Sequence, residues 1–360
     1  MIETPALLLH LDVVEANLAL MAARGAALGI AIRPHIKTHK CVELGRRQIA
    51  HGARGVTVST LDEAEVFAAA GFEDILWAFP IDPGHIPHAR RVGERTRLGV
   101  VVDDLDTARA LRGSGLSGWL KVDCGYHRAG VDPESPYALT VAEALSGPGA
   151  SFGGIASHSG HAYKTRNRRE AAAVAEEERS VMAAFADRLR RAGIAVPAVS
   201  VGSTPAMMAL ERADGVTEGR PGNYVFFDRT MVEIGVARPE DVGVTVLTTV
   251  VSHQPGSSQL VVDAGALALS KDVGPTHLGL APAMGAIRGH AELTLSSLSQ
   301  EHGIVQAESP DGLAGRFKVG ETLEIVPNHS CLTVAQFDRY HVMQGGREID
   351  SWKIERGRAT

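Results

Sequence analysis

The chain has 360 residues, of which 44% are hydrophobic and 22% are charged, and its formal net charge is −6 at pH 7. This length and apolar content allow a large core in one or two domains, and a mildly acidic chain without blocks of like charge argues against nucleic acid or an anionic membrane as the partner. The three cysteines, Cys41, Cys124 and Cys331, are odd in number and far apart, which argues against a disulfide framework. Because we find no signal-peptide pattern and no apolar run of membrane-spanning length, we expect a cytoplasmic protein. The charge balance favours a small molecule as its partner.

Residues 12–238 alternate between short β-rich runs and helical patterns. Asp12 and Glu15 have the spacing of a capping box, which predicts the start of the first helix. Eight βα units predict an α/β fold, a (β/α)8 TIM-type barrel with its site at the carboxyl ends of the strands; a doubly wound open sheet is the alternative. The eight predicted strands are residues 30–34, 55–59, 75–79, 98–102, 119–123, 154–157, 198–202 and 224–227.

The pattern changes after residue 238. Alternating or β-branched runs separated by Gly, Pro, Asn and Asp follow, and no long helical period appears. We therefore expect a second, mostly antiparallel β domain made of residues 1–11 and 239–360, with the barrel formed by residues 12–238.

Lysines and histidines crowd the end of the first predicted barrel strand, in the stretch AIRPHIKTHK. Partial burial, or neighbouring cations such as Arg33 and His35, would lower the pKa of a lysine there and make its amine suitable for Schiff-base chemistry. Lys37 is a candidate for this role. The alternative is that Lys37 and Lys40 are ordinary solvated lysines of a loop.

Two glycine-containing segments predict a pocket for an anion such as phosphate. Gly202, Ser203 and Thr204 follow a strand and precede a proline that suits the first turn of a helix, so they offer backbone amides and hydroxyls. Gly222 and Asn223 precede the last predicted strand, and phosphate sites of such barrels are frequently built around the seventh and eighth strands. Taken singly, a capped helix start and a Pro-Gly turn explain the two segments equally well.

Further polar and aromatic residues follow the fifth and sixth strands. Arg128 could bind a carboxylate, a phenolate oxygen or a ring nitrogen at the barrel mouth, or could form a structural salt bridge. His158, His161 and Tyr163 come after the next strand and add to the same rim.

A possible metal site lies in the second domain, in the stretch VPNHSCLTV. His329 and Cys331 are two residues apart, so on an extended strand both side chains would project from one face and could bind one metal ion. Imidazole plus thiolate favours zinc, and two protein ligands would leave positions open for substrate. The alternative is a buried free cysteine beside a surface histidine.

Taken together, these segments resemble the family of D-serine dehydratases and D-threonine aldolases, pyridoxal-phosphate enzymes with a barrel similar to that of alanine racemase. The resemblance runs nearly end to end, in the order TPALLLHLDVVEANL, RPHIKTHK, VSTLDEAEVFAAAGFEDILWAFP, KVDCGYHRAG, GSTP, RPGNYVFFD, VDAGALALSKD, EHG and PNHSC. It implies pyridoxal 5′-phosphate and a divalent metal as cofactors, and a homodimer.

The resemblance also implies roles for individual residues. Lys37 matches the lysine that binds the cofactor as a Schiff base and later removes the α proton, whereas Lys40 matches no catalytic position. His329 and Cys331 match a metal pair, with Zn²⁺ as the first choice. The residues that match the cofactor's phosphate cup, its ring or the pocket around it are Arg128, His158, Tyr163, Gly202, Ser203, Thr204, Gly222, Asn223 and Tyr224.

One departure separates two branches of this family. The aldolases look as though they use a GHCD stretch, whereas His-x-Cys after Pro-Asn, as in this chain, is similar to the dehydratases. We therefore expect a dehydratase that converts D-serine to pyruvate and ammonia through metal-assisted loss of the β hydroxyl. Retro-aldol cleavage to glycine and an aldehyde is the alternative reaction, and a pyridoxal-phosphate carrier without activity is a rival that would need neither the β domain nor the metal pair.

Overall fold

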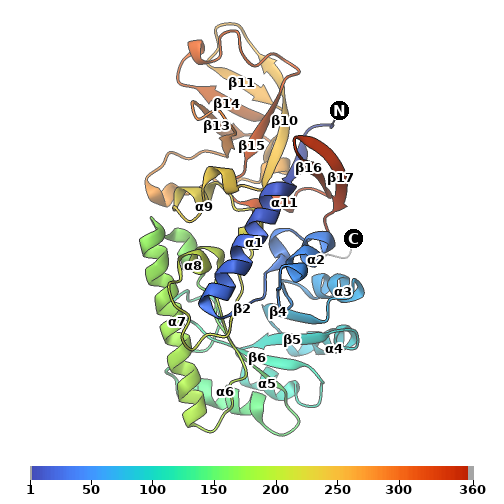
Figure 1. Ribbon diagram of the computed structural model, residues 1–360, viewed down its shortest axis with the longest axis vertical. Helices are drawn as coiled ribbons and strands as arrows, with labels where there is room; N and C mark the ends of the chain where they lie inside the picture. The colour runs from blue at the N-terminus through green and yellow to red at the C-terminus, as the bar shows by residue number, and fades with distance from the viewer. Residues whose placement is uncertain (1, 356–360) are drawn as a thin grey trace. The chain divides into compact units, whose positions relative to one another are not determined.

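The computed structural model describes residues 2–355 and divides into two compact units (Figure 1). One unit is Leu18–Gly222, and the other contains the residues up to Asn17 together with Asn223–Ile354. The boundaries that we predicted from the sequence, residues 12 and 238, remain a prediction. No helix among the described residues is long and apolar enough to cross a membrane.

The unit Leu18–Gly222 is a barrel of eight parallel strands, which confirms the predicted (β/α)8 class. The strands pair in the order β2-β9-β8-β7-β6-β5-β4-β3, and an isolated parallel bridge between His35 and Thr57 joins the two end strands. The strands are β2 (Ala31–Ile32), β3 (Val56–Val58), β4 (Asp74–Pro80), β5 (Arg97–Val102), β6 (Ser117–Lys121), β7 (Phe152–Ala156), β8 (Val199–Val201) and β9 (Glu218–Gly219).

Capped helices connect these strands. Thr60, Asp104, Ser135 and Asn167 each accept a hydrogen bond from a backbone N–H in the first turn of a helix, so the sequence marks where these helices begin. The helices are α1 (Leu11–Leu28), whose first residues belong to the other unit, α2 (Val42–Ala50), α3 (Leu61–Ala69), α4 (Ile86–Gly93), α5 (Leu105–Ala110), α6 (Pro136–Ser146), α7 (Arg168–Arg191) and α8 (Thr204–Ala209).

Two local predictions in this region are wrong. Residues 224–227 are not the eighth strand: Asn223–Val225 forms a 3-10 helix, η4, and the eighth strand is the two-residue β9. A strand this short shows no periodicity, and the apolar run behind it is buried on all sides rather than on one face. Asp12 does not cap α1; it lies inside the first turn, and its carboxylate accepts hydrogen bonds from Gln344 and Gly345.

The second unit is built on a nine-stranded sheet that is antiparallel except where β1 pairs with β16, which confirms the mostly antiparallel β domain. β1 contributes the N-terminal strand of this sheet. The short helices of the second unit are α9 (Arg229–Glu233), α10 (Ala266–Leu269) and α11 (Ser330–Val334). The strands are β1 (Ala6–His10), β10 (Val244–His253), β11 (Gln259–Val262), β12 (Ala286–Ile287), β13 (Leu293–Leu298), β14 (Gly303–Ala307), β15 (Thr322–Val326), β16 (Arg339–Gln344) and β17 (Arg347–Lys353).

Candidate active site

A cavity of about 440 Å³ opens at the carboxyl-terminal end of the barrel, where each of the eight strands or the residues just after it contribute to the lining. This is the end at which barrel enzymes build their sites. We call it the barrel cavity. Its lining residues are His35, Lys37, Ser59, Ala78, Phe79, Pro80, Val101, Lys121, Arg128, Ala129, Ala156, Ser157, His158, Gly202 and Arg220.

Lys37 lies in the barrel cavity, on the 3-10 helix η1 (Ile36–Thr38) that follows β2. The His35 side chain caps this helix by accepting a hydrogen bond from the Lys37 N–H, with 3.4 Å between the nitrogen atoms. Lys40 behaves differently, because its amine forms an ion pair with the buried carboxylate of Glu63. The structure therefore separates a lysine that lines the cavity from one whose amine holds two segments together.

The charges around Lys37 differ from those that we inferred from the sequence. Burial, together with the charge of Lys37, lowers the pKa of His35 well below its usual value, so this imidazole is neutral near pH 7. Arg33 is buried and is paired with Asp74 and Glu218. The cations that line the cavity beside Lys37 are instead Lys121, Arg128 and Arg220.

His158 connects two strand ends in the cavity wall. Its Nδ1 lies 3.1 Å from the carbonyl oxygen of Gly202, to which it donates. Burial and the charges of Lys37 and Lys121 lower the pKa of His158 well below its usual value, so the ring is neutral. Two neutral imidazoles, from His35 and His158, therefore lie in the same cavity as the Lys37 amine.

Arg128 reaches the cavity across an aromatic ring. Its guanidinium carbon lies 4.9 Å from the ring centre of Tyr126, which packs edge-on against His158 and stacks on His161. Arg128 has no ion-pair partner among residues 2–355, so its charge is available to a carboxylate. Tyr163, which we predicted near the cofactor, does not line the cavity, and its assigned role remains a prediction.

The predicted phosphate residues of the barrel lie close together. Gly202 lines the cavity with φ of +112°, and the amide of Gly222 donates to the hydroxyl of Thr204 over 3.2 Å. A Cβ on Gly222 would come within 3.0 Å of the His35 carbonyl oxygen, so only glycine fits there without a shift. The hydroxyl of Ser203 caps α8. Closely packed glycines and hydroxyls beside a cavity are a chemical fit for a phosphate group.

A buried carboxylate that we did not predict organises these strand ends. Glu178 of α7 is 1% exposed and accepts hydrogen bonds from the hydroxyls of Ser157 and Ser159, each at 2.7 Å. It also accepts the amide of Gly202 at 3.1 Å. Glu178 lies in a run of glutamates within a helical pattern, where nothing distinguishes a buried carboxylate from solvated ones.

The remaining predicted site residues belong to the second unit. Asn223 donates to Asp228 at 2.6 Å and to Ser330 at 3.0 Å, whereas its own buried Oδ1 has no hydrogen-bond partner among the described residues. Tyr224 is 3% exposed in η4. The places assigned to both residues at the cofactor remain predictions.

His329 and Cys331 come together, but not on a strand. His329 precedes α11 in an extended conformation, and Cys331 lies in the first turn of that helix. Although burial favours the neutral imidazole, the charge of Cys331 and a hydrogen bond with Asp272 raise the pKa of His329 to about 11. An imidazolium beside a thiolate must lose its proton to bind a metal, as metal ligands generally do.

A third possible donor, a carboxylate oxygen, lies close to His329. Asp272 Oδ2 is 3.6 Å from His329 Nδ1, and the hydrogen bond with His329 lowers the pKa of the Asp272 carboxyl. An imidazole, a thiolate and a nearby carboxylate are the donor types that zinc and similar ions prefer. The donor set therefore fits a divalent metal, with two firm protein ligands.

Comparisons with known proteins agree with this division of the chain. Residues 9–230 match the family described as Alanine racemase, N-terminal domain, and residues 243–343 match the Putative serine dehydratase domain. The chain is 38% identical to the D-threo-3-hydroxyaspartate dehydratase of Delftia sp. (strain HT23), covering 98% of this chain and 97% of that protein, and their structures superpose with a TM-score of 0.93.

Two further relatives carry different names. The D-serine dehydratase of Dictyostelium discoideum is 37% identical over 97% of this chain and 95% of its own length. The D-threonine aldolase of Arthrobacter sp. is 30% identical over 98% of this chain and 92% of its own length.

Solved structures of the Delftia dehydratase include two alanine variants. One replaces a histidine, and the other replaces a cysteine two positions further along the chain and is in the metal-free form. The spacing of the two altered residues equals that of His329 and Cys331.

Proposed function

The chain belongs to the family of D-serine dehydratases and D-threonine aldolases, which join an alanine racemase N-terminal domain to a serine dehydratase domain, and from this premise we propose that it is a pyridoxal-phosphate- and metal-dependent lyase of D-3-hydroxy amino acids. Within that class we propose dehydration, with D-serine converted to pyruvate and ammonia. The family consists of pyridoxal-phosphate-dependent dehydratases and aldolases, so lyase chemistry is the part common to all its members.

The observation that carries the proposal is the placement of Lys37. Its amine faces a cavity with neutral His35 and His158 and with three further cations, Lys121, Arg128 and Arg220. Such a set suits a dianionic phosphate and a carboxylate and leaves one amine for covalent chemistry. The glycines at positions 202 and 222 support a phosphate at the same end of the barrel.

Pyridoxal phosphate supplies an aldehyde that condenses with amines and a ring that takes up the electrons of a broken bond. In this proposal the chain's residues do the rest. The Lys37 amine would hold the cofactor and, with substrate bound, would accept the substrate's α proton. Arg128 binds a substrate carboxylate, and His158, with its Nδ1–H fixed on Gly202, keeps the strand ends in place.

His329 and Cys331 would hold the metal, which acts as a Lewis acid on a β hydroxyl when bound. The donor chemistry of the pair, the approach of Asp272 and the paired variants of the Delftia dehydratase support this assignment. Zinc is our first choice because imidazole and thiolate together form a borderline-soft site.

A substrate panel tests the reaction type. The purified protein is incubated with D-serine, D-threonine and D-threo-3-hydroxyaspartate, with the L isomers and the Lys37→Ala variant as controls. We expect pyruvate, 2-oxobutyrate and oxaloacetate, each with an equivalent of ammonia. Glycine and an aldehyde, which is glyoxylate in the case of 3-hydroxyaspartate, without pyruvate, 2-oxobutyrate or oxaloacetate would refute the dehydratase.

Aldol cleavage is the second candidate function. It is favoured by the 30% identity to the Arthrobacter D-threonine aldolase over nearly the whole chain. The same parts serve either reaction, because both start from a D-3-hydroxy amino acid and differ in the bond that breaks. The His-x-Cys stretch after Pro-Asn is our reason for placing the chain on the dehydratase side.

We also propose that the protein acts in the cytoplasm as a homodimer. The location rests on the sequence features described above and the dimer on the family resemblance, and both are independent of the chemistry. Sedimentation equilibrium of the cofactor-loaded protein measures the assembly, and a mass of one 38.1 kDa chain would contradict the dimer.

A further inference from the structure

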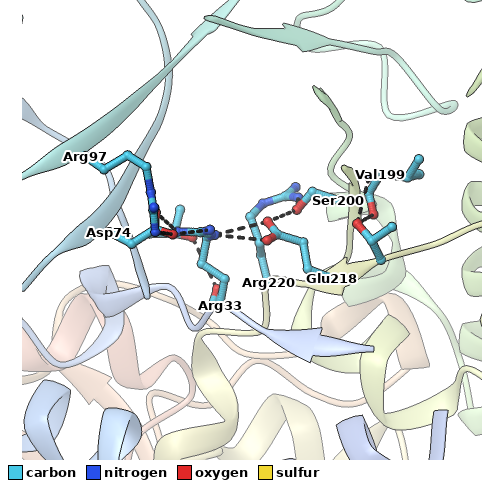
Figure 2. A network of polar contacts seen from close by, with 9 residues as sticks. Arg33, Asp74, Arg97, Val199, Ser200, Glu218 and Arg220 are labelled. Atoms are coloured by element: carbon cyan, nitrogen blue, oxygen red, sulfur yellow. Dashed lines mark hydrogen bonds and ion pairs between the residues drawn. The ribbon is translucent and has the colours of Figure 1, made fainter. Parts of the chain in front are cut away.

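A chain of polar contacts, buried except at Arg97, runs through the barrel from Arg97 to Arg220 (Figure 2). Barrel interiors are normally filled with bulky apolar side chains. Here Arg33, Glu218 and Ser200 are 2%, 0% and 0% exposed, so charged and polar groups take the place of an apolar layer. Removing these charged groups from water costs free energy, so we looked for a role that they perform in the barrel.

Arg33 is the centre of the chain. Its Nε lies 3.1 Å from both carboxylate oxygens of Glu218, and its Nη1 and Nη2 lie 2.5 and 3.1 Å from the two oxygens of Asp74. Arg97, at the start of β5, also donates to Asp74 at 2.8 Å. Arg33 is therefore fully neutralised by two carboxylates, one on each side.

Glu218 leads from Arg33 to the barrel cavity. Ser200 donates its hydroxyl proton to Glu218 Oε1 at 2.6 Å, and the same hydroxyl accepts a hydrogen bond from Nη1 of Arg220. Nη2 of Arg220 donates to the carbonyl oxygen of Ser157. Glu218 and Arg220 are two residues apart along β9 and beyond, which puts them on one face, and Arg220 lines the cavity.

Glu218 affects Arg220 through its charge as well as through the hydrogen bonds of Ser200. Arg220 is 6% exposed, and burial lowers the pKa of its guanidinium, whereas the charges of Glu218 and Glu178 oppose that effect. A buried ion pair is by itself weak evidence for stability, because well-packed apolar groups often do as well. What apolar groups could not do is orient a guanidinium at the wall of the cavity.

We propose that Glu218 is a positioning residue of the cofactor pocket: through the hydroxyl of Ser200 it fixes the place of the Arg220 guanidinium and balances its charge. Asp74 neutralises the opposite side of Arg33 and is connected to Arg220 only indirectly, through Arg33, Glu218 and Ser200. The inference rests on the proposed function only in taking the barrel cavity as the site of pyridoxal phosphate.

The test compares Glu218→Gln with Asp74→Asn, a matched change at the other carboxylate of the same arginine. Glu218→Gln makes the surroundings of the cavity more positive, which disfavours a cationic nitrogen between Lys37 and the cofactor. We expect the midpoint of the pH titration of the visible cofactor band to fall by about one pH unit. Asp74→Asn should lower the melting temperature and leave this midpoint within about a fifth of a unit.

Ser200→Ala is a milder variant in case Glu218→Gln does not fold. It removes only the hydroxyl between Glu218 and Arg220, so it should move the midpoint in the same direction by less. Crystal structures of the cofactor-free variants give an independent readout. In Glu218→Gln and Ser200→Ala the Arg220 guanidinium should leave the Ser157 carbonyl, and in Asp74→Asn it should stay.

Two results would overturn the positioning role. The first is that Glu218→Gln and Ser200→Ala leave both the titration midpoint and the position of Arg220 unchanged. The second is that Asp74→Asn shifts the midpoint as much as Glu218→Gln does, which would mean that these polar contacts have only a structural role. Failure of the proposed function looks different, because the wild-type protein would then show no visible cofactor band. The crystal structures would still decide whether Glu218 fixes Arg220.

Discussion

The Nδ1 atom of His158 lies 3.1 Å from the carbonyl oxygen of Gly202. Since a carbonyl oxygen can only accept, Nδ1 carries the proton, and Nε2 of this neutral ring carries none. The contact joins the end of β7 to the end of β8 within the wall of the barrel cavity. The contact, together with the hydrogen bond from the Gly202 amide to Glu178, holds the Gly202 segment in place.

Replacing His158 with alanine should weaken cofactor binding. The loss of one buried hydrogen bond and of the ring that packs on Tyr126 frees the Gly202 segment, and we expect the dissociation constant for pyridoxal phosphate to rise about tenfold. His161→Ala is the control, because that ring stacks on the same tyrosine but does not line the cavity. Equal effects of the two substitutions, measured by equilibrium dialysis, would contradict the special role of His158.

Removing either member of the metal pair should remove the metal and spare the cofactor. We expect His329→Ala and Cys331→Ala to retain less than about a tenth of the bound divalent metal and to lose D-serine turnover, while the visible cofactor band persists. Cys124→Ala is the control, because this thiol is buried in the barrel unit. Metal analysis by mass spectrometry decides, and full metal content in both variants would exclude the pair.

Lys121 should give a distinctive pH dependence of stability. Burial, followed by the charge of Arg220, lowers its pKa to about 8. In the unfolded chain the pKa of this lysine is near 10.4, so the unfolded chain binds more protons than the folded protein between about pH 8 and 10. Below pH 8 the buried charge therefore lowers the free energy of unfolding. This loss disappears as the pH rises from about 8 to 10.

Lys121→Met should therefore stabilise the protein at pH 7, by up to about 3 kcal/mol, and should abolish the rise in stability between about pH 8 and 10. Because the amine lines the barrel cavity, the same variant should bind the cofactor less well. Urea unfolding at pH 7 and pH 10 checks the first statement, with Lys164→Met, an exposed lysine, as the control. If Lys121→Met lowered the free energy of unfolding equally at both pH values, the charged Lys121 would not be destabilising the folded protein.

The sequence predicts which residues line the barrel cavity better than it predicts the polar residues inside the barrel. Lys37, Arg128, His158 and Gly202 could be placed together because each follows a parallel strand, and such strands end at one side of a barrel. Arg220 and Glu218 could not, because the two-residue strand β9 has no visible pattern and charged residues are poor predictors of a barrel interior.

The metal pair shows the reverse case. A spacing of two residues suggested a strand, and the structure has an extended residue followed by a helix, yet the side chains still interact. The proximity of His329 and Cys331 could therefore be predicted although the local conformation could not, and their role as metal ligands remains a prediction. The charges around Lys37 were also misjudged, because the pairing of Arg33 with Asp74 joins residues 41 positions apart.

The account as a whole depends on Lys37 being the amine that binds the cofactor. Lys37→Ala should abolish covalent attachment, whereas Lys40→Ala should keep it and lose only the ion pair with Glu63, at about 1 to 3 kcal/mol of stability. The most direct measurement is borohydride reduction of the wild-type protein in the presence of pyridoxal phosphate, followed by peptide mapping. We predict a single pyridoxyl group on Lys37; a label on Lys40 or Lys121, or no label at all, would contradict the account.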